Sequence, residues 1–386
     1  ERGPTTNSVG PSNGNLRGPA NNAVTSGRTR ALWFDLNDPS RKTVWLGAVS
    51  GGLWKTTDIS ASPANWTLIS DYFDNLAVTA ITQDPLNKNI LYFGTGEKTF
   101  NTDAVRGGGI WKSVDNGNNW NLLPGTQNFW NVSRIVCDAA GNVYVATIGS
   151  NGIQRSTDGG ATWTNITPQG LTSRVTELRI STTGRLHIVC GYLNGAAPAT
   201  TGHRYTDNPV TVAPATWSEP AVPYPTTYNT ELAVVGNTLY ALPSDANDRT
   251  PTIYKSTDGG FIWSPTITSP PSPSSDSEEN PSINTGQGWF DLAIGADPAD
   301  PNRVLAGGLN FFKSDNGGGS WTRISRWVGD RIMYVHADHH AVVWEGTQVL
   351  LATDGGVFYS SDNGNTFTDR NVGLRTKQFY SCAIHP

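Results

Sequence analysis

The chain has 386 residues and a formal net charge of -5, and it contains 42 glycines, 24 prolines and a single methionine. This much Gly and Pro, with only 15% charged residues, disfavours long helices and predicts an all-β fold of short strands and turns. Without a basic run, a nucleic-acid partner has no electrostatic support, and no stretch approaches the ~18 consecutive apolar residues of a membrane span. We therefore expect no nucleic-acid binding and no membrane insertion.

The chain opens with a segment rich in Asn, Gly and Pro, residues 1–29, which we expect to be extended. After it, a short phrase recurs seven times, as in Ser156-Thr-Asp158-Gly-Gly-Ala-Thr-Trp163, where an aromatic residue follows the Asp by five positions. Two of the copies, at Asp58 and Asp207, are degenerate and carry insertions before the aromatic residue. The anchor positions of the seven copies are Asp58, Asp115, Asp158, Asp207, Asp258, Asn316 and Asp362. Their spacing of 43 to 58 residues is typical of propeller blades, so the sequence predicts a seven-bladed β-propeller.

Each phrase is predicted to be a hairpin between the outer strands of a blade. Asp-Gly or Asn-Gly supplies the positive φ of a tight turn, the carboxylate accepts hydrogen bonds from turn N–H groups, and the aromatic ring packs on the neighbouring sheet. Two strand-like runs precede each phrase, for example Val78–Ile81 and Ile90–Phe93. The predicted propeller spans residues 30–374, with blades at 30–70, 76–125, 131–168, 174–222, 228–271, 286–327 and 333–374.

Three features lie outside this repeat. The Ser/Pro/acidic stretch that begins at Ser269 is predicted to be a mobile loop between the fifth and sixth blades. Residues 375–386 resemble the strand and turn that open a blade, so they either close the ring or begin a further domain C-terminal to residue 386, and we favour the second. The cysteines, Cys137, Cys190 and Cys382, sit in strand-like runs and are predicted to be buried thiols.

The repeated phrase matches the Asp-box, or BNR repeat, and from about Arg28 onward the chain resembles Asp-box β-propellers. Val49-Ser-Gly-Gly-Leu-Trp54-Lys-Thr-Thr-Asp58 and the Gly-Thr-Gly-Glu97 run carry the resemblance further. This group includes sialidases, sortilin-type receptors, xyloglucanase-type glycoside hydrolases and a photosystem assembly factor. The chain most resembles the group's many secreted bacterial proteins of unknown activity, and this resemblance implies a secreted or cell-surface bacterial protein.

The densest group of candidate ligands is Tyr334-Val-His336-Ala-Asp338-His339-His340. In a strand, alternation would place His336, Asp338 and His340 on one face, and two imidazoles with a carboxylate suit a divalent metal, the one cofactor that the sequence suggests. The alternative is that these side chains hydrogen-bond neighbouring inner strands and stiffen the ring.

Two carboxylates are predicted to face one mouth of the ring, because Glu97 and Asp354 each end the second strand of a blade. Such a pair could act as acid and base in glycoside hydrolysis, or each could hold its loop by accepting backbone N–H groups. Arg28 and Arg30 are predicted to be structural or channel-lining residues. Trp289 lies near a blade boundary and would either stack on a ligand or pack between blades. Arg28, Arg30, Glu97, Trp289 and Asp354 are thus the candidate ligand-binding residues.

Catalytic signatures of the resembling hydrolases are missing at the matching positions. Xyloglucanase-type enzymes have a catalytic Asp beside the Gly-Gly of their first blade, whereas Ala48-Val-Ser-Gly-Gly52 has no carboxylate there. The Arg-Ile-Pro phrase of sialidases does not accompany Arg28 and Arg30. The sequence therefore favours a secreted, non-catalytic binding or scaffold module that recognises glycan or protein through one face. The alternative is a glycoside hydrolase of xyloglucanase-like or sialidase-like type that acts through paired carboxylates.

Overall fold

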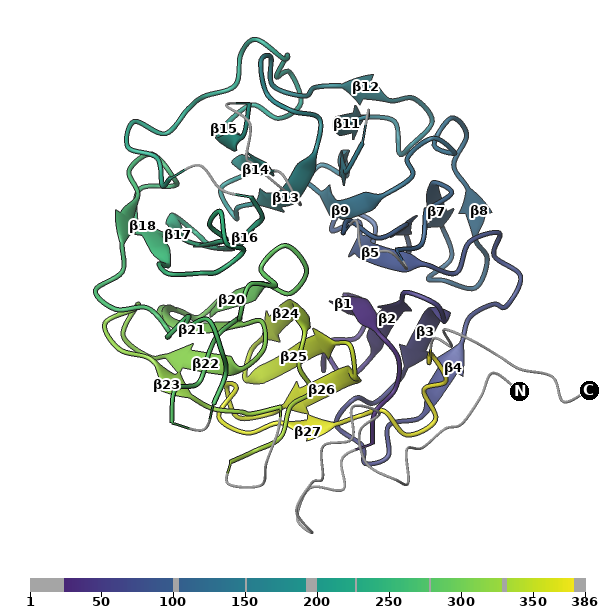
Figure 1. Ribbon diagram of the computed structural model, residues 1–386. Helices are drawn as coiled ribbons and strands as arrows, with labels where there is room; N and C mark the ends of the chain where they lie inside the picture. Colours follow the sequence, from purple (N-terminus) through teal and green to yellow (C-terminus); the bar gives the residue numbers. More distant parts are fainter. Residues whose placement is uncertain are drawn as a thin grey trace, which may run out of the picture.

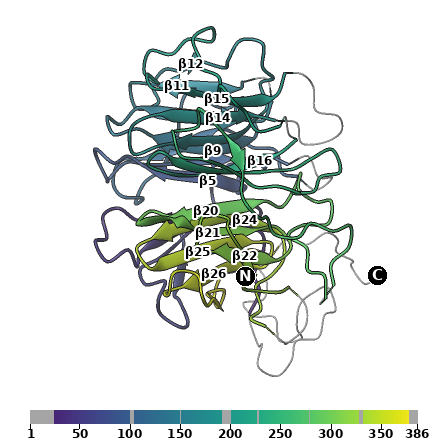
Figure 2. The same cartoon turned by 90° about the vertical axis from the view of Figure 1, so that its left-hand side faces the viewer.

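The computed structural model describes residues 24–99, 104–149, 151–191, 200–225, 228–277, 279–327 and 332–377. These residues form seven antiparallel sheets arranged as blades around a central axis, which confirms the expected all-β, seven-bladed propeller (Figure 1). Figure 2 shows the ring from its rim, with the sheets of successive blades one above another. Within the described ranges, no helix has the length and apolar character that spanning a bilayer would require.

The first three blades each have four strands. Blade 1 comprises β1 (Thr29–Phe34), β2 (Val44–Ala48), β3 (Gly52–Thr56) and β4 (Trp66–Leu68). Blade 2 comprises β5 (Val78–Gln83), β6 (Leu91–Thr95), β7 (Ile110–Ser113) and β8 (Asn121–Leu122). Blade 3 comprises β9 (Val132–Cys137), β10 (Val143–Thr147), β11 (Ile153–Ser156) and β12 (Thr164–Asn165).

The other four blades repeat the pattern, with one short member. Blade 4 comprises β13 (Val175–Ile180), β14 (Leu186–Cys190) and β15 (Gly202–Thr206), and only an isolated bridge from Tyr205 to Ser218 stands where the fourth strand would be. Blade 5 comprises β16 (Thr230–Val235), β17 (Thr238–Pro243), β18 (Tyr254–Ser256) and β19 (Ser264–Pro265). Blade 6 comprises β20 (Ala293–Asp297), β21 (Asp300–Gly307), β22 (Phe311–Ser314) and β23 (Thr322–Arg323). Blade 7 comprises β24 (His339–Glu345), β25 (Gln348–Thr353), β26 (Gly356–Ser360) and β27 (Thr368–Asp369).

The hairpins between the outer strands have the hydrogen bonds expected of the repeated phrase. The Asp158 carboxylate accepts the backbone N–H of Thr162 at 2.9 Å and the hydroxyl of Ser156 at 2.7 Å, and that hydroxyl accepts the N–H of Gly160 at 2.7 Å. The same arrangement recurs at three other Asp positions and, with an amide oxygen, at Asn316. The degenerate copy at Asp207 differs, because its carboxylate pairs with Arg185.

The ring is closed by packing between the first and last blades. Leu32 and Leu46 of blade 1 share one core with Leu350 and Val357 of blade 7. Across the same junction, the Trp66 indole donates to the Arg370 carbonyl at 2.6 Å. Each described sheet is built from strands that follow one another in the chain, so none of the described strands is exchanged between blades.

Several expected features fall on or near residues that are not described. Residues 1–23 of the N-terminal segment and residues 378–386, including Cys382, lie outside the described residues, so the closing-strand and further-domain hypotheses stay predictions. Cys137 and Cys190 are buried free thiols.

The Ser/Pro/acidic stretch between blades 5 and 6, which we expected to be mobile, is anchored where it is described. The Asp276 carboxylate accepts hydrogen bonds from the Asn310 amide at 2.8 Å, the Trp327 indole at 3.1 Å and the backbone N–H of Ser282 at 2.8 Å. Composition alone did not show that an acidic residue of this stretch meets three donors, two of them side chains from the neighbouring blade.

Candidate functional site

A central channel runs along the propeller axis, lined by the first strands of all seven blades. Its main cavity has a volume of about 730 Å³ and mostly aliphatic walls, including Leu32, Ile81, Ile135 and Ala233. We call the end at which these inner strands begin the upper mouth; Arg28, Glu97 and Asp354 lie there. A volume of several hundred Å³ is typical of small-molecule sites.

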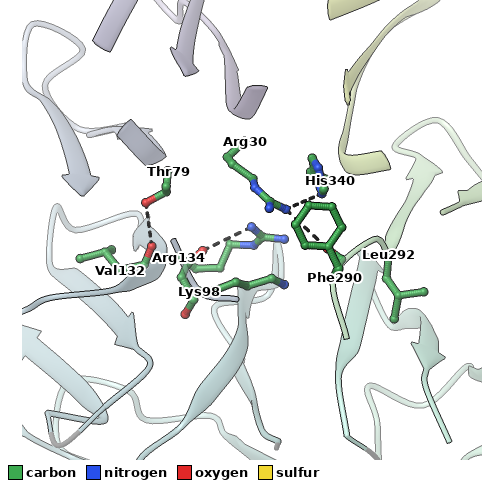
Figure 3. Close-up of a pocket in the computed structure, with 9 residues that line it drawn as sticks. Arg30, Thr79, Lys98, Val132, Arg134, Phe290, Leu292 and His340 are labelled. Atoms are coloured by element: carbon green, nitrogen blue, oxygen red, sulfur yellow. Dashed lines mark hydrogen bonds between the residues drawn. The ribbon is translucent and has the colours of Figure 1, made fainter. Parts of the chain in front are cut away.

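β-Bulges near the start of the inner strands aim polar side chains into the upper mouth. The register of β1 with β2 shifts between Thr29 and Ala31, so Arg30 is the extra residue, and His340 occupies the same place in blade 7. Thr79 in β5 is the equivalent residue of blade 2. Bulges often re-aim a side chain at the rim of a fold. Here they bring residues from three blades to the wall of one small cavity (Figure 3).

Glu97 is held by two arginines at this mouth. One carboxylate oxygen, Oε1, accepts from Arg28 Nη1 at 3.0 Å and from Arg30 Nη2 at 3.0 Å, and Oε2 accepts the backbone N–H of Val105 at 3.2 Å. The Glu97 side chain is fully buried. The Val105 contact is of the loop-holding kind expected for this carboxylate, whereas its two contacts with arginines were not predicted. A carboxylate so enclosed has no free face for a substrate.

Asp354 and His340 form the other half of the mouth. His340 Nε2 lies 2.6 Å from Asp354 Oδ1, and His340 Nδ1 lies 2.5 Å from Arg30 Nη1. Burial and the nearby Arg30 charge lower the pKa of His340 to about 3, so the ring is neutral at physiological pH. Because Arg30 can only donate, Nδ1 accepts and Nε2 carries the proton that is donated to Asp354.

The charge on Asp354 is stabilised by its neighbours. Burial by itself would raise the pKa of Asp354, but the His340 hydrogen bond and the Arg30 and Arg28 charges hold that pKa below its ordinary value. Arg28 Nε is 3.9 Å from Asp354 Oδ1. The structure thus brings Arg28, Arg30, Glu97 and Asp354 together at one mouth, where the sequence had placed the two carboxylates.

Two further carboxyl groups lie beside Asp354. Burial and the Asp354 charge raise the pKa of Asp338 to about 7. The pKa of Asp291 is raised well above its ordinary value by complete burial and by the adjacent Asp338. No N–H or hydroxyl donor of the described residues reaches either carboxylate oxygen of Asp291. Burial therefore favours the neutral, protonated form of both the Asp291 and the Asp338 carboxyl groups.

The predicted metal set does not form. Strand β24 begins only at His339, and Asp338, before it, has a positive φ of 61°. His340 occupies the bulge, so side chains do not alternate between the two faces of a strand over the residues on which the prediction relied. His336 lies before the strand, where its Nδ1 is 3.0 Å from the Ala337 carbonyl. Among the described residues, no group of three or more His, Cys, Asp and Glu side chains is arranged to hold a metal ion.

A second charged cluster, which the sequence reasoning missed, lies beside the small cavity that Arg30 lines. Arg134 of β9 binds Glu177 of β13 at 3.0 Å through Nε and also binds Glu231 of β16. Lys98 and Arg179 complete the cluster, the first by pairing with Glu231 and the second with Glu177 at 3.1 Å. The sequence did contain a signal of this cluster, because the inner strands β9, β13 and β16 are otherwise largely apolar and each carries a charged residue near its start.

Aromatic side chains surround the same mouth. Trp289 is half-buried against Phe290, with ring centroids 5.4 Å apart, and the Arg30 guanidinium lies 4.7 Å from the Phe290 ring centroid. Trp130, which precedes β9, is 41% exposed, and the Arg106 guanidinium lies 3.5 Å from its ring centroid. Trp289 thus packs beside Phe290, whose ring lies against Arg30, while Trp130 presents a ring to solvent.

Relatives of this chain include xyloglucan-degrading enzymes. A xyloglucanase of Paenibacillus sp. is 23% identical over 379 residues, which cover 86% of this chain and 32% of that protein. A probable oligoxyloglucan-reducing end-specific xyloglucanase of Neosartorya fischeri is 27% identical over 111 residues, 28% of this chain and 12% of that protein. The chain spans no more than about a third of the length of either of these curated relatives.

Solved structures show the same fold at low identity. The GH74 xyloglucanase from Xanthomonas campestris matches with a TM-score of 0.62 and 16% identity, over 89% of this chain and 53% of that one. YCF48 bound to D1 peptide matches with a TM-score of 0.56 and 15% identity, over 91% of this chain and 98% of that one. A family model described as the DUF6242 beta propeller domain matches residues 43–285. Because that match spans more than half of the sequence, the chain belongs to the DUF6242 beta propeller domain family.

Proposed function

We propose that this chain is a non-catalytic propeller module that binds a xyloglucan-like glycan at its upper mouth. The observation that carries the proposal is the state of Glu97, whose carboxylate is fully buried and held by two arginines. Acid–base catalysis needs carboxyl groups that reach the scissile bond from both sides. The small cavity beside Arg30 has a volume of only about 20 Å³, too small for a sugar ring. A glycan would therefore lie across this mouth.

Exposed aromatic rings around the mouth support a carbohydrate ligand. Tyr72 is 93% exposed in the connection between blades 1 and 2, and Trp130 lies in the next connection. The Asn75 amide donates to the Arg106 carbonyl at 2.7 Å, so the Tyr72 connection contacts the loop whose Arg106 stacks on Trp130. Flat rings held by such contacts are suited to stack on the apolar faces of sugars. The names of the curated relatives point to xyloglucan as the glycan to test first.

The test is the affinity of the purified chain for soluble xyloglucan, measured by isothermal titration calorimetry with intact polysaccharide and with its oligosaccharides. We expect Trp130→Ala to weaken binding about tenfold or more, which corresponds to about 1.4 kcal/mol or more of lost stacking. Phe261→Ala is the matched control, because Phe261 is 45% exposed but lies in the hairpin between β18 and β19, away from the upper mouth.

Two results would contradict the proposal. Absence of xyloglucan binding by the wild-type chain would reject this ligand, and extended peptides would then be the next class to test, given the peptide in the YCF48 complex. Equal losses in Trp130→Ala and Phe261→Ala would reject the upper mouth as the site. Since the proposed ligand is a polysaccharide, the proposal includes a secreted or cell-surface location.

A second candidate function is glycoside hydrolysis by Asp338 and Asp354. One observation favours it: the pKa of Asp338 is raised to about 7 while that of Asp354 is lowered, which is the split expected of a general acid and an ionised partner. Release of new reducing ends from xyloglucan, abolished by both Asp338→Asn and Asp354→Asn, would establish this activity in place of simple binding.

A further inference from the structure

A small cavity at the upper mouth is lined by three cationic side chains from three blades. Its volume is about 20 Å³, and its walls include Arg30 of β1, Lys98 after β6 and Arg134 of β9. Figure 3 shows the three side chains extending into the same space, with Phe290 and His340 on its far side. No carboxylate is among the residues that line this cavity. A cavity of this size has room for about one water-sized particle.

The counter-ions of these cations lie outside the cavity. Glu97 accepts from Arg30 through Nη2, and Glu231 pairs with Lys98 and Arg134. These carboxylate contacts do not use every N–H donor of the three cations, because an ammonium has three N–H groups and a guanidinium has five. Arg30 Nε is buried and has no hydrogen-bond partner. A buried, unpaired donor of a charged group is costly, so an acceptor in this space would be strongly favoured.

The other polar groups on the wall do not supply that acceptor. The Thr79 hydroxyl donates to the Val132 carbonyl at 3.0 Å, and the Ser133 hydroxyl donates to the Val175 carbonyl at 2.6 Å. The acceptor nitrogen of His340 is already bound by Arg30 Nη1. Positive charge on the walls also favours an anion over water, because desolvated cations attract an anion strongly at short range.

From this arrangement we infer that the cavity is a binding site for one halide ion such as chloride. The anion would accept hydrogen bonds from Arg30 Nε and Lys98 Nζ, with Arg134 as a further positive charge on the wall. The cavity lies next to the 730 Å³ channel, because Arg30, Thr79 and Arg134 line both. This site is separate from the aromatic surface proposed to hold glycan.

The direct test is to soak crystals of the wild-type chain in bromide and record anomalous diffraction. We expect a bromide peak between Arg30, Lys98 and Arg134. An empty or water-filled cavity at high bromide concentration overturns the proposal. This measurement needs no variant, so it stays decisive even if substitutions in the cluster impair folding.

A second test uses thermal melting in potassium chloride, potassium acetate and potassium gluconate at equal ionic strength. We expect the wild-type Tm to rise with chloride beyond any rise in acetate or gluconate, since an anion that binds only the folded state stabilises it. A chloride response no larger than the acetate and gluconate responses overturns the proposal.

The matched pair of variants is Lys98→Met and Lys112→Met, two lysines of blade 2 replaced by the same neutral side chain. Lys112 donates to the Gly159 carbonyl at 2.7 Å, away from the cavity, so its variant should keep the anion response. Lys98→Met should raise the anion concentration for half-maximal stabilisation about tenfold or more. An unchanged response in Lys98→Met overturns the proposal, whereas xyloglucan binding should be retained in both variants.

Discussion

Replacement of Arg134 by Met tests whether the buried charge cluster holds the inner strands together. Arg134 Nε lies 3.0 Å from Glu177 Oε1, and the same guanidinium binds Glu231. The Glu177 and Glu231 side chains are 0% and 2% exposed, so Arg134→Met leaves two carboxylates in the interior with fewer partners. Breaking a buried pair in this way costs about 3–5 kcal/mol. Lys98 and Arg179 remain nearby, so we expect a loss of about 3 kcal/mol.

Arg204→Met is the matched control, because it removes a close arginine–glutamate ion pair whose carboxylate is exposed rather than buried. Arg204 Nη2 lies only 2.6 Å from Glu219 Oε1, but the Glu219 side chain is 68% exposed. Exposed pairs contribute about 0–1 kcal/mol because water screens them. The assay is the free energy of unfolding from urea denaturation, compared through midpoints and slopes. Equal losses in the two arginine variants would refute the argument that burial decides the strength of these pairs.

Two further measurements separate charge from packing. The double variant Arg134→Met/Glu231→Gln should recover part of the loss, because it removes one of the stranded charges. The pKa of Glu177 is held below its ordinary value: burial opposes this, but the Arg134 and Arg179 charges outweigh burial. That contribution to stability is present above the unfolded-state pKa of about 4 and is lost on acidification, so the deficit of Arg134→Met should shrink below about pH 4.

Three other substitutions test the upper mouth and the hairpin turns. The folded-state pKa of Asp338 is raised to about 7, so its contribution to stability is greatest below about pH 4 and declines as the pH rises to 7. Asp338→Asn should remove this part of the pH dependence of Tm, and an unchanged profile would contradict this prediction. Gly117→Ala should cost about 3 kcal/mol by denaturation, because φ is 83° and the new Cβ would lie 2.1 Å from the Trp45 ring. Gly125→Ala has a similar φ of 76° but open space, so it should cost only about 1 kcal/mol, and equal losses at the two glycines would rule out the clash.

The propeller was predictable because its repeated signal is local. Ser156, Asp158 and Gly160 hydrogen-bond within one turn, so the residue types and the spacing of the turn are fixed together in the sequence. That Glu97 and Asp354 lie at one mouth was predictable for a related reason, because the second strands of all blades end at the same mouth. The match of the repeat to the Asp-box itself stays a prediction.

The parts that were missed depend on contacts between distant segments. Nothing near Lys98 in the sequence indicates that it meets Glu231, 133 positions later and three blades away. The proposed metal set around Asp338 was wrong because alternation describes a regular strand, whereas a positive φ and a bulge are set by packing at the channel mouth. The enclosure of Glu97 by both arginines was likewise not readable from their spacing.

The bulges explain why Arg30 and His340 meet at the mouth, where blades 1 and 7 adjoin. Five inner strands share a register shift near their start, and the residues at that place, in blade order, are Arg30, Thr79, Ser133, Thr176 and His340. Only blades 1 and 7 place a basic side chain there, and the acids that meet these two side chains come from blade 2 and blade 7. The exposed rings of Tyr72 and Trp130 flank blade 2. A glycan that stacks on these rings would therefore lie over the junction of blades 1 and 2, beside the charged part of the mouth, where Trp130→Ala is expected to weaken binding.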